Sequence, residues 1–261
     1  MRKVRFWPVF RVDNFTILWL LINGERCRTV LINVKNLTKR SGKSYIRPSK
    51  MPCQFRCITG GSGSILLVTT RMKINPQIDS SNGNKQEIYT LSLETVFLEE
   101  LLRYIFENHW RSIVFGPIIE GGAYEFRCPR EPRSITLFDG YLTVHFGGTH
   151  FHICIGENMG SASSPTPPAL KRSRRTSRAE IVRSFDQNGS PIIWQLRLFN
   201  GDGTPQLNIF FPNPFLTDED GIADTPDWSR LAVWDDIAMR YLGRKQAQDP
   251  LDRSGLGFRA P

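Results

Sequence analysis

The chain has 261 residues, of which 40% are hydrophobic and 23% charged, a composition typical of a folded protein with room for one large domain or two small ones. It contains no apolar run of about 18 residues, so a membrane-spanning helix is excluded, and the shorter run at 15–22 is not followed by a signal-peptide cleavage site. Five cysteines without framework spacing argue against a disulfide-stapled secreted fold.

Positive charge is concentrated in the first quarter of the chain. The formal net charge is +9, but residues 1–71 hold 14 of the 34 basic side chains and two of the 25 acidic ones, so they contribute +12 and the remainder −3. We expect residues 1–71 to be disordered, or to lie upstream of a true start at Met72. A basic tail for an anionic partner and a small separate domain are the alternatives. The negative remainder makes nucleic-acid binding by residues 72–261 unexpected.

The first part of that remainder is predicted to contain one helix and one strand. The polar stretch 75–90 is expected to form a loop. Apolar side chains at helical spacing then predict a helix that is capped by Ser92 and ends near His109. Weak alternation over 124–128 predicts a strand.

A three-stranded meander is the clearest element of the sequence. The pairs at 139–140 (DG) and 147–148 (GG) are signals for two-residue hairpin turns of type I′, which need a positive φ at both residues. They separate three expected strands at 134–138, 141–146 and 149–155.

The later part is predicted to alternate helices and strands. A helix is expected from 167 to about 186, followed by a hairpin of strands 192–199 and 206–211 and by a last helix within 225–243. Tight turns join neighbouring strands in antiparallel pairs. We therefore expect a single α+β domain with its core at about 86–245, in which helices pack on one face of an antiparallel sheet.

The hairpin turns also fix which side chains of the meander share a face. With two-residue turns, His145 lies opposite His150, Thr143 opposite His152 and Tyr141 opposite Cys154. One face is then apolar and the other polar. The apolar face comprises Ile135, Leu137, Leu142, Val144, Phe151 and Ile153, and the polar face Ser134, Thr136, Thr143, His145, His150, His152 and Cys154.

Three of the four histidines of the chain meet on the polar face. Imidazoles on adjacent strands are close enough to share one ion, so His145, His150 and His152, with Cys154 as a softer fourth ligand, predict a transition-metal site, with zinc preferred. The other candidates for the same pocket are Thr136, Thr143, Tyr141, Glu157 and Cys128. No residue is assigned a catalytic role. A metal-free pocket for a small ligand and a structural or interaction face without catalysis are the alternatives.

The run 171–178 (KRSRRTSR) is a second place where charge gathers. A basic cluster on a helix can bind phosphate. We favour a solvated helix face whose arginines pair with nearby acids. The acidic segment 218–221 is expected to be a surface loop, because the calcium-loop pattern that it begins is not completed.

Over about residues 115–254 the chain resembles a widespread family of uncharacterised bacterial proteins, a domain of unknown function. The resemblance implies a bacterial, cytoplasmic protein and assigns no role to any residue. The strings on which it rests are 116–122 (GPIIEGG), 126–129 (FRCP), 137–143 (LFDGYLT), 150–157 (HFHICIGE), 198–201 (LFNG), 212–216 (PNPFL), 226–231 (PDWSRL) and 249–254 (DPLDRS).

Overall fold

The structure is a computed structural model. The residues that it describes are 5–12, 15–22, 25–33, 53–59, 65–71, 74–81, 83, 85–244 and 248–259, with side chains described from residue 74 onward. Contacts divide the chain into two units, residues 1–46 with 55–68 and residues 47–54 with 69–261, and each unit is described by itself. No helix in the described ranges is long and apolar enough to cross a membrane.

The first unit contains the antiparallel strands β1 (Arg5–Val12), β2 (Phe15–Ile22) and β3 (Glu25–Asn33) and most of β4 (Cys53–Thr59) and β5 (Ile65–Arg71). β1, β2 and β3 form one sheet in that order, and β4 and β5 form another. The prediction of a disordered or upstream segment at 1–71 falls in part on residues outside the described ones and stays a prediction.

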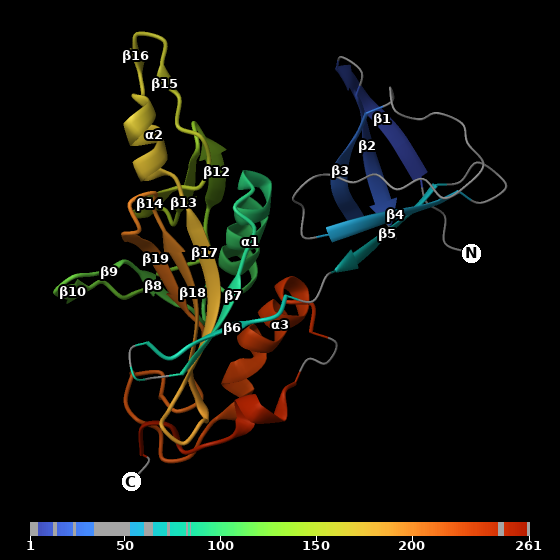
Figure 1. The fold of residues 1–261 in the computed structure, drawn as a ribbon. Coiled ribbons are helices and arrows are strands. Elements are labelled where there is room, and N and C mark those ends of the chain that lie inside the picture. The colour runs from blue at the N-terminus through green and yellow to red at the C-terminus, as the bar shows by residue number, and fades with distance from the viewer. Residues whose placement is uncertain are drawn as a thin grey trace. The chain divides into compact units, whose positions relative to one another are not determined.

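An antiparallel seven-stranded sheet forms the centre of the second unit (Figure 1). Its order is β11-β8-β19-β18-β17-β7-β6, and every neighbouring pair is antiparallel. The predicted hairpin of 192–199 and 206–211 is confirmed as β18 and β19. The strand bounds are β6 (Gln77–Asp79), β7 (Gln86–Thr90), β8 (Val114–Gly116), β11 (Phe126–Arg127), β17 (Arg178–Phe185), β18 (Pro191–Phe199) and β19 (Pro205–Phe210).

Two predictions about this sheet were wrong. The stretch 75–90, expected to be a loop, supplies strands β6 and β7, and the helix expected over 167–186 ends early, as α2 (Pro168–Arg174), before β17 begins. β17 pairs on both sides, and Arg183 lies opposite Glu87 of β7, where the two side chains form an ion pair of 2.6 Å. A cross-strand ion pair stabilises a polar strand, and the sequence of one strand alone does not show it.

The helices α1 (Thr95–Asn108) and α3 (Ala232–Tyr241) confirm the first and last predicted helices, and α3 is preceded by the 3₁₀ turn η2 (Trp228–Leu231). α1 begins three residues after Ser92, whose hydroxyl accepts a hydrogen bond from the Glu94 amide instead of capping the first turn. The α1 side chain Phe106 contacts both Phe115 of β8 and Phe151 of the meander, with ring centroids 5.2 and 5.3 Å apart.

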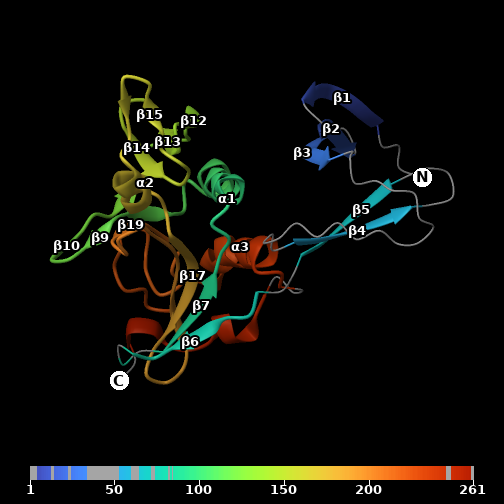
Figure 2. The same cartoon turned by 45° about the horizontal axis from the view of Figure 1, so that its top comes forward.

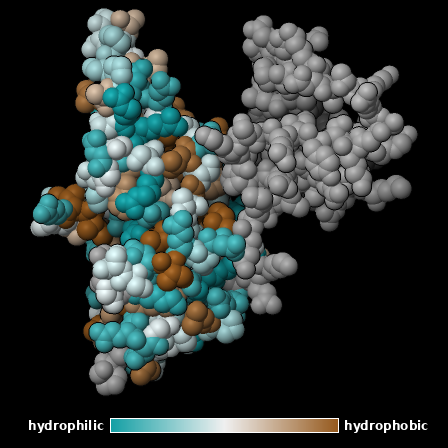
Figure 3. Space-filling view, in the orientation of Figure 1, coloured by the Kyte–Doolittle hydropathy of each residue, from teal (hydrophilic) through white to brown (hydrophobic). Residues whose placement is uncertain are grey.

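The predicted meander is confirmed, but as a sheet of its own beside α1 (Figure 2). Its strands are β12 (Ser134–Phe138), β13 (Tyr141–His145) and β14 (His150–Cys154). Two short hairpins complete the strands. They pair β9 (Ile118–Ile119) with β10 (Gly122–Ala123) and β15 (Gly160–Ser161) with β16 (Ser164–Pro165). Brown, apolar surface is visible on the arm that contains β9 and β10 (Figure 3). Ile119 of β9 is exposed, as are Tyr124 and Phe126 further along the chain.

The end of the chain is attached to the sheet through a buried carboxylate. The 3₁₀ turns η3 (Pro250–Arg253) and η4 (Gly257–Arg259) follow α3, and Asp252 in η3 is fully buried. One oxygen of this carboxylate accepts hydrogen bonds from Arg183 (2.7 Å) and the Trp194 indole (3.0 Å). The other accepts from the Trp234 indole (2.7 Å) and Arg244 (2.8 Å).

Candidate functional site

The register of the meander is the one that the sequence predicts. His145 pairs with His150, Thr143 with His152 and Tyr141 with Cys154. At the first turn both residues have positive φ, as type I′ requires, whereas at the second only Gly147 does, at 103°, which is the type II′ pattern. A two-residue turn of either type gives the same register, so the face assignment is unaffected.

The three imidazoles lie next to one another on the polar face. The rings of His145 and His150 are stacked, with centroids 5.7 Å apart and planes within 14°, and the rings of His150 and His152 are 4.9 Å apart and near-perpendicular. The amide of Gly147 donates a hydrogen bond to His145 Nδ1 (3.1 Å), and the Thr143 hydroxyl and His152 Nδ1 are 2.7 Å apart. Two of the three rings are therefore held in place by hydrogen bonds within the chain.

The three rings are not arranged as a metal-ligand cluster in the described residues. Among the residues with described side chains, no group of three or more His, Cys, Asp or Glu side chains is placed to hold a metal ion. Stacked rings present their faces to each other, whereas metal-binding lone pairs lie in the ring plane, so His145 and His150 do not aim at a common point.

The cysteine candidates, Cys128 and Cys154, are both free thiols, and burial favours the protonated form of each. Cys154 is buried and its Sγ donates to the Gly156 carbonyl at 3.5 Å, and burial raises the pKa of this thiol. Burial raises the pKa of Cys128 to about 12. A metal ligand must be a thiolate. Cys128 follows β11 in the large sheet and does not line the pocket that contains Cys154.

Two further candidates, Glu157 and Thr136, are exposed. Glu157 is exposed, and its carboxylate is 3.8 Å from the Lys171 ammonium, with which it forms a surface ion pair. Thr136 is exposed on the edge strand β12.

Three predicted residues do meet in a pocket. Tyr141, His152 and Cys154 line a pocket of about 220 Å³ together with Ile153 and two residues that the sequence analysis missed, Arg174 and Gln206. Arg174 ends α2, and Gln206 belongs to β19 of the large sheet. The basic run 171–178 was a signal for Arg174, but the sequence did not show that α2 ends beside the meander.

Hydrogen bonds fix the two missed residues. Arg174 Nη1 donates to the Asn158 side-chain oxygen (3.0 Å), and the Gln206 amide donates to the Arg174 carbonyl (2.7 Å). The Thr176 hydroxyl donates to the Gln206 side-chain oxygen (2.8 Å). The pocket is thus assembled from three elements that are distant in the sequence.

The turn at the other end of β13 anchors the same region. The Asp139 carboxylate accepts hydrogen bonds from the Met159 and Gly160 amides and from the Asn158 side chain, at 2.6, 3.0 and 2.6 Å. The bond from the Met159 amide contributes most to lowering the pKa of Asp139 below its ordinary value. The segment that follows the meander is therefore fixed to the Asp139 turn, and with it Asn158, which accepts the hydrogen bond from Arg174.

The second unit is thus an α+β domain of antiparallel sheets with a small polar pocket between the meander, α2 and β19. Residues 75–243 match the model of DUF7676, a family of unknown function, and the chain belongs to this family. The match begins upstream of residue 115, where the resemblance in the sequence was placed. No curated protein matches the chain.

Proposed function

We propose that the pocket beside the meander binds a small anion without a metal ion. The observation that supports this is the charge of its lining. Arg174 is permanently charged, Tyr141, His152 and Gln206 add polar groups, and none of the described side chains that line the pocket is acidic. An anion gains from such a lining, and a cation would meet only repulsion from Arg174.

The size and donor set narrow the class of ligand. At about 220 Å³ the pocket is smaller than the ~300–1,000 Å³ of sites for drug-sized molecules. The planar guanidinium of arginine matches the oxygens of carboxylate and phosphate groups. A small carboxylate or phosphate is therefore the proposed ligand.

The test compares two arginines of the same helix. Inorganic phosphate and acetate are titrated into the full-length chain by isothermal titration calorimetry. Arg174→Gln is expected to weaken binding about tenfold or more, the size of one charge-assisted hydrogen bond. Arg172→Gln is the matched control, because Arg172 is exposed on α2 and does not line the pocket. Equal affinities of the two variants, or no binding by the wild type, would contradict the proposal.

Metal binding by His145, His150, His152 and Cys154 is the alternative. The adjacency of the three rings supports it. The Gly147 amide opposes it at His145, because it donates to Nδ1 and so leaves the ring proton on Nε2. A bound metal stabilises the native state by mass action, so a chelator would lower the melting temperature. With an anion pocket, we expect equal melting temperatures with and without chelator for zinc-supplemented protein purified without a His tag. A chelator-sensitive value that becomes insensitive in His150→Ala would favour the metal.

We also propose how the helices pack and how far the domain extends, and we keep the expected cellular setting as a prediction. α1 and α3 would cover one face of the seven-stranded sheet, because both contribute fully buried apolar residues to one core with its strands. Residues 72–261 would form one domain. The cytoplasmic, bacterial setting stays a prediction from the sequence.

A further inference from the structure

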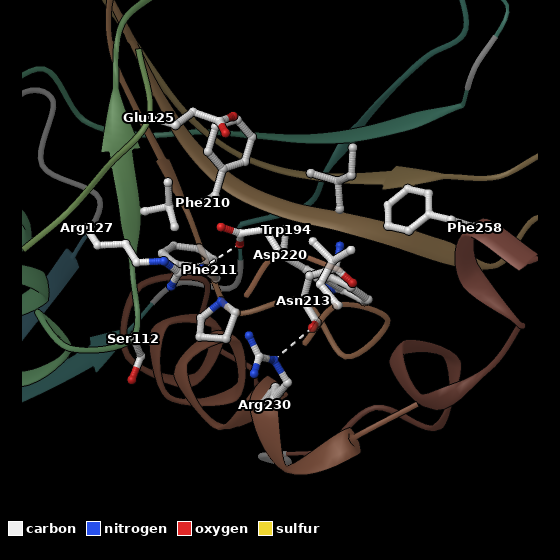
Figure 4. Close-up of a pocket in the computed structure, with 14 residues that line it drawn as sticks. Ser112, Glu125, Arg127, Trp194, Phe210, Phe211, Asn213, Asp220, Arg230 and Phe258 are labelled. Atoms are coloured by element: carbon white, nitrogen blue, oxygen red, sulfur yellow. Dashed lines mark hydrogen bonds and ion pairs between the residues drawn. The ribbon is translucent and has the colours of Figure 1, made fainter. Parts of the chain in front are cut away.

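A second pocket, of about 180 Å³, shares no lining residue with the first. Four of its 14 lining residues are aromatic and six are polar or charged (Figure 4). Trp194 comes from β18, Phe210 from β19 and Phe258 from the C-terminal turn η4, and Phe211 completes the set. Segments from three parts of the sequence therefore build one apolar wall.

The pocket as a whole, polar lining included, has room for a single ring. An apolar cavity of ~150 Å³ in another protein takes up benzene, and this pocket is slightly larger. The Trp194 indole N–H is already bonded to Asp252, so Trp194 has no donor left for a ligand, and little of its ring is open because the residue is 1% exposed. Ring stacking and edge contacts with aromatic walls favour an aromatic ligand over an aliphatic one.

Two arginines line the same pocket, and each forms an ion pair with an aspartate of the loop 217–224. Arg127 Nη2 is 2.5 Å from Asp220, and Arg230 Nη1 is 2.6 Å from Asp218. Arg230 is also fixed by a bond from its Nε to the Asn213 carbonyl (2.9 Å). Within the described part of the chain, Nη2 makes the only hydrogen bond of the Arg127 guanidinium, so Arg127 has donors left for a ligand.

Arg127 already donates a hydrogen bond to a carboxylate, that of Asp220, at this position. Figure 4 shows the Asp220 carboxylate, itself a lining group of the pocket, joined to Arg127 across one side. Both side chains are substantially exposed, at 41% and 66%. An ion pair this exposed is weak, so a ligand carboxylate can share or displace it at low cost.

We infer that this pocket binds a small aromatic carboxylate, with its ring between the aromatic walls and its carboxylate on Arg127. Asp220 then acts as an internal competitor for the same guanidinium. The two members of one ion pair therefore have opposite effects on affinity. A purely structural ion pair would not behave in this way, because removing either member would then have the same effect.

The test uses benzoate as the probe and the full-length chain. Affinity is measured by calorimetry and by ligand-observed NMR. Arg127→Gln is expected to weaken benzoate binding about two- to fivefold, the size of an exposed ion pair, and Asp220→Asn to strengthen it by a similar factor, because the Arg127 guanidinium is then free for the ligand. Arg130→Gln, an exposed arginine three residues further on that does not line the pocket, is the matched control and should leave affinity unchanged.

Acetate and benzylamine test the two halves of the ligand. Acetate lacks the ring and should bind at least tenfold more weakly than benzoate. Benzylamine carries the opposite charge and would be drawn to Glu125, which also lines the pocket. Tighter binding of benzylamine than of benzoate, equal binding of acetate, no benzoate binding, or shifts of the same sign in the Arg127 and Asp220 variants would each overturn the inference.

Discussion

The Asp252 carboxylate is fully buried and nevertheless remains ionised. Burial alone would raise the pKa of this carboxyl, but the charge of Arg183 and the hydrogen bonds from Arg244, Arg183 and Trp194 outweigh it, so the pKa lies below its ordinary value of 3.8. The pKa of Arg183 is raised in turn, since the attraction of Asp252 and Glu87 exceeds the cost of burying the guanidinium. The two charges therefore depend on each other.

Replacing Asp252 by Asn is expected to cost about 3 kcal/mol of unfolding free energy at pH 7, because it leaves buried arginines short of a partner. Because the folded pKa is depressed, this contribution is present above the unfolded pKa and is lost as pH falls through the folded value. The difference between wild type and variant should therefore shrink below about pH 4. Urea denaturation at pH 7 and pH 3.5 measures it.

Asp249 provides the control at the residue scale. It contacts the same Arg183 at 3.1 Å, but its side chain is 33% exposed. Partly exposed ion pairs contribute less, so Asp249→Asn should cost about 1 kcal/mol or less. Equal losses in the two variants, or a pH-independent loss in Asp252→Asn, would show that the buried charge is not the cause.

At the scale of elements, the meander is the part that the sequence predicted best. Its two turns are local signals, and each fixes the pairing of the strands that flank it. The expected faces follow. Leu142 and Val144 are fully buried, Ile135 and Ile153 nearly so, and His150 and His152 are exposed on the other side.

The buried face of the meander should contribute directly to stability. Leu142→Ala is expected to cost ~2–5 kcal/mol, since the removed atoms leave a cavity in a packed core. Thr136→Ala, on the exposed face of the neighbouring strand, should change stability by no more than ~0.5 kcal/mol. Chemical denaturation of both variants compares them. Similar small losses would mean that the apolar face does not pack into the core.

Elements whose partners are distant in the sequence were harder to predict. Helix propensity and basic charge continue from α2 into Arg178, but Ile181 and Val182 form a central strand because β7 and β18 lie on either side. Propensity is a weak prior that tertiary pairing overrides. The same reason explains β7, whose Glu87 is stabilised by Arg183, 96 residues later in the chain.

For the molecule as a whole, half of the lining of the pocket beside the meander could be predicted. Tyr141, His152 and Cys154 follow from one local register, while Arg174 and Gln206 reach the pocket only through the packing of α2 and β19. The second pocket gave no sequence signal. Its walls meet only when β18, β19 and η4 come together.

The position of Asp252 also bears on where this domain ends as a folding unit. The family match stops at residue 243, nine residues before the carboxylate that receives two arginines and two indoles. A fragment cut at the family boundary would keep Arg183, Trp194 and Trp234 in the interior and lose the acceptor that they share. A loss of about 3–5 kcal/mol is a large share of the ~5–15 kcal/mol that keeps a typical domain folded. We therefore expect a fragment that ends at residue 243 to be less stable than the full chain, which chemical denaturation of the two would measure.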